Sequence, residues 1–155
     1  MCFLSNKIAI RNFLLCIGLL LPGCTELGDM VVIEFNLHNH TVKPEELPQE
    51  LFPGRKRGSS PNCIARRSEV NPMMIGVCVA SDGASVSLYR AFRNRFEIKS
   101  KGISDEVRAS EGYTELLEAA SKLRLNFSKR GITFTEGFPK PVRFEVLQKR
   151  FDLSR

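Results

Sequence analysis

The sequence lacks any apolar run long enough to cross a membrane. Its longest run, Phe13 to Leu21, has nine residues, whereas a transmembrane helix needs roughly 20. Neither glycine (11 residues) nor proline (8 residues) is in excess, and no internal repeat is present. These absences exclude a multi-span membrane protein, collagen and global disorder. The 155 residues, 43% of them hydrophobic and 26% charged, are typical of one globular domain.

Recognisable catalytic and metal-binding motifs are also absent. The chain has no G-x-S-x-G elbow and no glycine-rich phosphate or dinucleotide loop. Its two histidines, His38 and His40, share one face of a predicted strand without a third ligand nearby, so simple exposure is favoured over metal binding. No C-x-x-C pair suggests zinc. We therefore predict no catalytic residue, metal or cofactor, and favour binding over catalysis.

The N-terminal segment has the layout of an export signal. Lys7 and Arg11 precede the apolar run, Pro22 and Gly23 break it, and no acidic residue comes before Glu26. A basic start, a short apolar stretch and a small residue at the break are typical of a secretory signal peptide.

The end of that segment, Leu21-Pro22-Gly23-Cys24, resembles the lipobox of bacterial lipoproteins. In that class the signal is cut before the cysteine, which carries lipid on its sulfur and usually on its new amino group. The resemblance implies a signal peptide over residues 1–23, lipidation of Cys24 and a lipid-anchored linker over residues 24–29. Thr25, where inner-membrane lipoproteins tend to have Asp, implies the outer membrane, facing the periplasm. A plain secretory signal, or a retained N-terminal helix in an intracellular chain, remains the alternative.

This interpretation assigns a fate to each of the five cysteines. Cys2 and Cys16 leave with the signal, and Cys24 carries the lipid. Cys63 and Cys78 remain as an even pair in an oxidising compartment, which predicts a disulfide. Two separate buried thiols are the alternative, because sequence does not reveal the geometry that a disulfide requires.

Strands are predicted by alternation and by turn chemistry. Residues 30–38 alternate apolar and polar side chains, as in a half-buried strand. Asp82-Gly83 between two apolar runs predicts a hairpin over residues 74–90. A further strand is expected over residues 95–100, and the proline-rich stretch 41–62 is expected to be a long loop. The predicted hairpin pairs are Val79 with Val86, Val77 with Leu88 and Cys78 with Ser87.

The C-terminal third changes period. Residues 110–125 predict one helix, which Ser110 can cap at its start and which Gly112 weakens. A strand pair, residues 132–134 and 142–146, follows. The expected fold is a single α+β domain over residues 30–148, in which one helix packs on an antiparallel sheet of five or six strands. A polar tail is expected over residues 149–155. The apolar stripe of the helix comprises Tyr113, Leu116, Leu117, Ala120 and Leu123.

Basic residues cluster before and after the hairpin, and aromatic residues are interleaved with the second set. Basic and aromatic residues together can bind single-stranded nucleic acid, but an exported protein rarely meets it. An acidic protein partner or anionic lipid headgroups then suit the same charges, and a merely solvated face is the other interpretation. The candidate partner-binding residues are Arg55, Lys56, Arg57, Arg90, Arg93 and Arg95.

These features together predict an exported, lipid-anchored envelope protein that binds another protein. By analogy with small anchored domains, its role would be in assembly, in a secretion system or in immunity to a toxin. Two alternatives stay open. One is a cytosolic nucleic-acid-binding protein with a retained N-terminal helix, and the other is a small envelope hydrolase.

Overall fold

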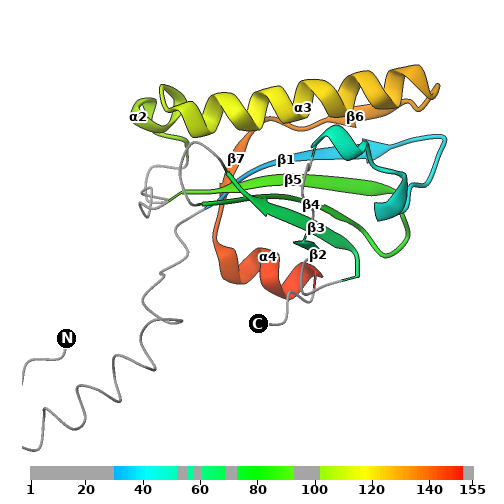
Figure 1. Ribbon diagram of the computed structural model, residues 1–155, viewed down its shortest axis with the longest axis horizontal. Coiled ribbons are helices and arrows are strands. Elements are labelled where there is room, and N and C mark those ends of the chain that lie inside the picture. The colour runs from blue at the N-terminus through cyan, green and yellow to red at the C-terminus, as the bar shows by residue number, and fades with distance from the viewer. Residues whose placement is uncertain (1–29, 52–55, 58–60, 69–72, 93–101, 152–155) are drawn as a thin grey trace, which may run out of the picture.

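The structure, a computed structural model, describes residues 30–51, 56–57, 61–68, 73–92 and 102–151. An antiparallel sheet lies between two helices, with α3 (Glu111–Lys129) over one face and α4 (Phe144–Phe151) over the other (Figure 1). The predicted α+β class, with an antiparallel sheet and one main helix, is confirmed. Within the described ranges, no helix combines the length and the apolar character that spanning a membrane requires.

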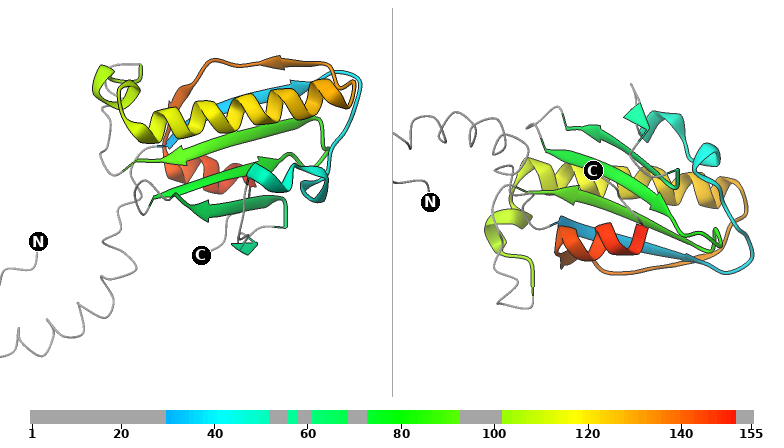
Figure 2. Two further views of the ribbon diagram at one scale, coloured as in Figure 1. Left: turned by 45° about the horizontal axis from the view of Figure 1, so that its top comes forward. Right: turned by 90° about the horizontal axis from the view of Figure 1, so that it is seen from below.

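The sheet places the first strand of the domain in its interior. The order is β2-β3-β4-β5-β1-β6, and β7 also pairs with β1. The β6–β7 segment runs along the outer side of β1 and forms one edge of the sheet, while β2 forms the other (Figure 2). The strands are β1 (Met30–Leu37), β2 (Lys56–Arg57), β3 (Cys63–Arg67), β4 (Met74–Val79), β5 (Ser85–Ala91), β6 (Phe134–Glu136) and β7 (Lys140–Val142).

The hairpin of β4 and β5 has the predicted register. Its loop is wider than a two-residue turn, because Ala80 N–H bonds to Ser85 O (2.9 Å) and Gly83 N–H to Ala80 O (2.8 Å). Gly83 has a φ of 72°, a left-handed conformation that glycine adopts without a steric penalty. The register survives the wider loop because hydrophobic alternation selects it independently. The confirmed pairs are Val77 with Leu88, Cys78 with Ser87 and Val79 with Val86.

Helix α3 begins where its cap predicts and extends four residues further than expected, to Lys129. The hydroxyl of Ser110 accepts a hydrogen bond from Tyr113 N–H at 3.3 Å, which satisfies a donor that the helix leaves unpaired. Phe127, in the added turn, packs edge-on against Phe35 of β1. The buried residues on the sheet-facing side include Leu116, Ala119, Ala120, Leu123 and Phe127.

The predicted strand over residues 142–146 was wrong. Strand β7 ends at Val142 and α4 begins at Phe144, so residues 149–151 are helical and the polar tail cannot begin at 149. Leu147 and Phe151 are buried against the sheet on the side opposite α3. Phe144, Leu147 and Phe151 are spaced three and four residues apart, and this helical period outweighs the short alternation from Val142 to Val146.

Other differences concern short elements. Strand β3 was not predicted, and the 41–62 loop contains β2 and two 3-10 turns, η1 (Pro44–Glu46) and η2 (Gln49–Leu51). The expected strand over 95–100 lies outside the described residues. On the second face of β1, α4 covers Met30 and Val32, so the N-terminal half of this strand is buried on both sides.

Candidate binding surfaces and a buried arginine network

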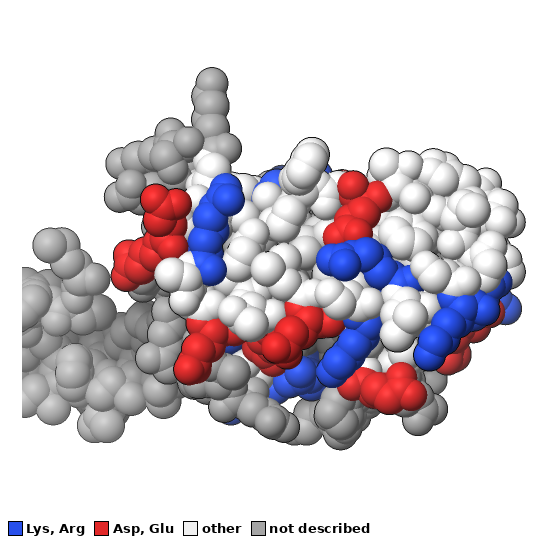
Figure 3. Space-filling model, turned by 90° about the horizontal axis from the view of Figure 1, so that it is seen from above, with Lys and Arg blue, Asp and Glu red and all other residues white. Residues whose placement is uncertain are grey.

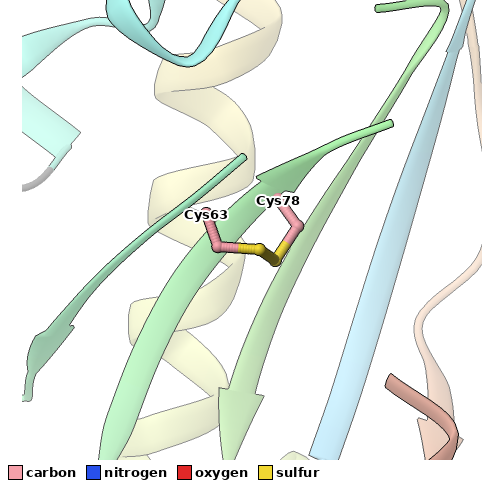
Figure 4. The surroundings of a disulfide bond; sticks show 2 residues. All are labelled: Cys63 and Cys78. Atoms are coloured by element: carbon pink, nitrogen blue, oxygen red, sulfur yellow. A yellow bond between two sulfur atoms is a disulfide. The ribbon is translucent and has the colours of Figure 1, made fainter. Parts of the chain in front are cut away.

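The predicted disulfide between Cys63 and Cys78 is present (Figure 4). The two residues lie directly opposite each other in β3 and β4, with their Cα atoms 4.1 Å apart. Both are buried, in the apolar cluster that includes Leu147 and Phe151 of α4. The hairpin register and the pairing of β3 thus bring the two sulfurs together across adjacent strands.

The prediction that Arg90 belongs to an exposed basic patch was wrong. Its side chain is 0% exposed, because Arg90 continues the alternation of Val86 and Leu88 onto the face that α3 covers. The guanidinium Nε donates to Glu115 Oε2 at 3.0 Å, and Nη1 donates to Ala91 O at 3.0 Å. Arg90 is therefore part of the interior, where it cannot meet a partner directly.

The other predicted basic residues divide between the sheet edge and segments outside the described ranges. Lys56 and Arg57 form β2, at the edge of the sheet. Arg55, Arg93 and Arg95, like the predicted lipidation site Cys24, lie outside the described residues. Because β3 and β4 separate β2 from β5, Arg90 does not join the two predicted basic sets into one surface.

Glu115 of α3 lies at the centre of a polar network that sequence reasoning missed. Its Oε1 pairs with Arg66 Nη2 of β3 at 3.1 Å. Its Oε2 accepts from the Arg90 guanidinium and, at 2.6 Å, from the hydroxyl of Ser68. Arg66 and Arg90 lie on either side of Ile75 on the same sheet face, so one carboxylate joins three elements: β3, β5 and α3.

Gly112 makes room for this network. A Cβ built at Gly112 would lie 2.4 Å from Arg90 Cζ, so any other residue there would displace the guanidinium. The helix accepts the lower helical propensity of glycine in its first turn because a buried arginine occupies that space. Gly112, just before the apolar stripe of the predicted helix, was the one signal in the sequence for such a close contact. It was interpreted only as a residue that weakens the first turn.

The charge state of Glu115 follows from its neighbours. Burial opposes ionisation, but hydrogen bonds from Ser68 and Arg90 and the charges of Arg90 and Arg66 outweigh it and hold the Glu115 pKa below its usual range. The ionised carboxylate compensates the buried guanidinium. Because both carboxylate oxygens are occupied, the network holds α3 in place on the sheet.

His38 and His40 are both exposed. His38 Nε2 lies 2.6 Å from Thr135 Oγ1 on the surface. In the ranges that the structure describes, no group of three or more potential ligands among His, Cys, Asp and Glu is close enough to hold a metal ion.

The β6–β7 edge contains a β-bulge that was not predicted. Glu136 pairs with Phe35, whereas Lys140 pairs with Val32, so the edge has one residue more than β1 between these pairs. Gly137 N–H bonds to Glu34 O at 2.7 Å and holds the start of the bulge against β1. The next residue, Phe138, is 92% exposed. The sequence predicted only a bend here, because Gly137 and Pro139 are typical of bends.

Ion pairs flank this edge on both sides of the sheet. On the α3 side, Arg124 Nε lies 2.7 Å from Glu136 Oε2 without hydrogen-bond alignment. On the α4 side, Glu34 pairs with Lys140 at 2.9 Å and with Arg150. Burial opposes the charge on Glu34, but hydrogen bonds from these two cations hold its pKa below its usual range. Over the α3 side, both signs of charge are interspersed without a large field of one sign (Figure 3).

Comparison with known proteins found no matching family model, no matching curated protein and no matching solved structure. A functional assignment therefore depends on features of this chain: the disulfide, the N-terminal segment, and the two edges of the sheet. The Glu115 network joins α3 to β3 and β5, which lie between those edges.

Proposed function

We propose that this protein is exported, is anchored by lipid on Cys24, and acts in the cell envelope by binding another protein. The observation that carries the proposal is the buried Cys63–Cys78 disulfide. Disulfides persist in oxidising compartments and are rare in the cytosol, so the bond supports export over an intracellular location. The resemblance of Leu21-Pro22-Gly23-Cys24 to a lipobox supplies the means by which an exported chain stays at the membrane.

Binding is favoured over the two alternatives by the way the charged side chains are used. Two of the basic residues that could have formed a nucleic-acid-binding surface, Arg66 and Arg90, instead face Glu115. A hydrolase would need a carboxylate set in a cleft for proton transfer; Glu34, Glu115 and Glu136 are held in ion pairs, and Asp105 and Glu106 are exposed on the surface. These contacts support a structural role, rather than a catalytic one, for the paired groups.

Lipidation is tested directly by labelling with radioactive palmitate. We expect label in the native chain and none in Cys24→Ala, because only the cysteine that ends the apolar run carries the lipid. Cys16→Ala is the matched control and should keep the label. Intact-mass analysis of the membrane fraction should show a diacyl or triacyl adduct on a chain that starts at Cys24. An unprocessed chain that starts at Met1 in the soluble fraction would refute the proposal.

Partner binding through the β2 edge is tested by replacing Arg55, Lys56 and Arg57 together with Ser. If these charges attract an acidic partner, association should slow and its salt dependence should weaken. If the three charges face solvent, as contact with a partner requires, the melting temperature should hardly change on their removal. Recovery of bound protein from detergent extracts at low and high salt is the measurement.

A matched control removes the same charge elsewhere, by replacing the exposed Lys122, Lys129 and Lys149 with Ser. Partner recovery should be retained in this variant. Equal recovery from the two triple variants at both salt concentrations would show that position does not matter, and would end the case for the β2 edge.

A further inference from the structure

The β6–β7 edge presents an aromatic ring that the fold does not use. Phe134, four residues earlier, packs against Phe35 and Phe127 in the core, whereas the bulge turns Phe138 outward to 92% exposure. Bulges at sheet edges commonly re-aim a side chain, and an uncovered apolar group on an edge invites unwanted contacts. We therefore expect another surface to contact this ring.

The backbone of this edge is poorly suited to pairing with another strand. Strands β6 and β7 have three residues each, and Pro141 in β7 has no N–H to donate. The bulge also interrupts the row of backbone groups between them. An occupant that adds a β-strand, from a partner or a second copy, would find few consecutive hydrogen-bonding groups here. An occupant that contacts only the side chains of this edge suits it better than one that pairs with its backbone.

The cations that flank this edge have more exposed side chains than the carboxylates that they pair with. The exposed fraction of the side chain is 42% for Arg124 against 27% for Glu136. It is 52% for Lys140 and 46% for Arg150, against 20% for Glu34. The more exposed member of each ion pair is thus the cation. An exposed aromatic ring on the same edge as exposed Lys and Arg side chains suits contact with an anionic lipid surface.

The predicted anchor can reach the same surface. Met30, the first residue of β1, is six residues after Cys24, so at most about 20 Å of chain separates them. Phe138 follows Gly137, which bonds to Glu34, four residues along β1 from Met30. That is roughly 13 Å at the rise of a strand. Cys24 lipid and Phe138 can therefore lie on one bilayer face, along the edge that Figure 2 shows outside β1.

We propose that the β6–β7 edge is a second membrane contact, in which Phe138 enters the headgroup region of an anionic bilayer and Arg124, Lys140 and Arg150 face the lipid phosphates. The proposal rests on the lipid anchor of the proposed function and assigns the orientation of the anchored domain. With this edge on the bilayer, β2 at the opposite edge of the sheet points away from the membrane.

The test uses tryptophan fluorescence, because the chain contains no tryptophan. Phe138→Trp adds a single fluorophore at an exposed position, where substitutions have little effect on stability. The full lipidated chain is reconstituted in vesicles of phosphatidylethanolamine and phosphatidylglycerol with brominated acyl chains. The emission of the introduced indole should move to shorter wavelength and lose most of its intensity. In vesicles of phosphatidylcholine alone, with the same brominated acyl chains, the quenching should be weaker, because the cations lose their anionic lipid partners.

Ser81→Trp is the matched control, in the exposed β4–β5 loop at the opposite end of the sheet from Met30, and it should keep a water-exposed emission. Intact-mass analysis of each sample reports the lipid adduct separately. Unquenched emission from a lipidated Phe138→Trp chain overturns the bilayer contact and leaves the anchor standing, whereas a missing adduct overturns both. Equal quenching in the two variants, or a shift in Phe138→Trp only after envelope proteins are added, also overturns the bilayer contact.

Discussion

Glu115→Gln is expected to lower the free energy of unfolding by about 3 kcal/mol, since it removes the counter-charge of a buried arginine. Gln keeps nearly the same shape and still accepts one hydrogen bond, so the loss isolates the charge. Arg90 is 0% exposed and has no route to water while α3 is in place. The Arg66 pair with Glu115 would be lost as well. Urea unfolding of the two proteins measures the difference.

Two further variants separate charge from packing. Glu118→Gln, on the exposed side of α3, should change stability by no more than about 0.5 kcal/mol. Adding Arg90→Met to Glu115→Gln should restore part of the loss, because apolar residues often replace a buried ion pair without penalty. Equal effects of Glu115→Gln and Glu118→Gln would contradict the network as described.

The same ion pair predicts an acid dependence. The pKa of Glu115 is lowered in the folded state from an ordinary value of 4.5. The stabilisation is therefore fully present above about pH 4.5 and is lost as pH falls through the folded-state pKa. The difference in stability between the native protein and Glu115→Gln should accordingly shrink in acid, and unfolding curves between about pH 7 and about pH 3 test the sign.

Local signals carried the correct sequence predictions. The β4–β5 register was predictable because a turn and two alternating runs all lie within residues 74–90, and either signal alone selects the same pairing. The start of α3 was predictable for a similar reason. The hydroxyl of Ser110 and the N–H of Tyr113 are three residues apart, and their bond needs no tertiary contact.

The missed features depend on contacts between distant segments. Arg90 looked like a surface residue because its partner Glu115 is 25 residues away in another element. Phe138 looked like part of a bend because a bulge is defined by the pairing of two strands, here with β1, whose Glu34 bonds to Gly137. In both cases a residue's local sequence is compatible with exposure or burial, and the tertiary pairing decides which one occurs.

Under the proposed function, the two edges of the sheet would give the anchored domain a direction. Strand β2, with Lys56 and Arg57, lies at one edge, and the bulged β6–β7 segment lies at the other. If the chain is anchored as proposed and the second edge meets the lipid, the first faces away from the membrane, where a soluble or membrane-bound partner can reach it. The Glu115 network joins α3 to the intervening strands β3 and β5.

Removing the Cys63–Cys78 disulfide is expected to lower the free energy of unfolding by about 3 kcal/mol. The bond closes a loop with a sequence separation of 15 residues, and in the chain-entropy model a loop of that length restricts the unfolded state by this amount. Cys63→Ala with Cys78→Ala is the variant, because alanine leaves no unpaired hydroxyl at two buried positions. Urea unfolding of the native protein and the double variant measures the loss.

The single variants distinguish loop entropy from lost packing. Either Cys63→Ala or Cys78→Ala opens the loop completely, so entropy predicts that each single variant loses almost as much as the double variant. Lost side-chain contacts would instead make the double variant lose about the sum of the two single losses, because each sulfur is packed separately against its neighbours. The single variants are kept under reducing conditions, which prevent a remaining thiol from pairing between molecules. A double variant as stable as the oxidised native protein would show that the disulfide does not stabilise this fold.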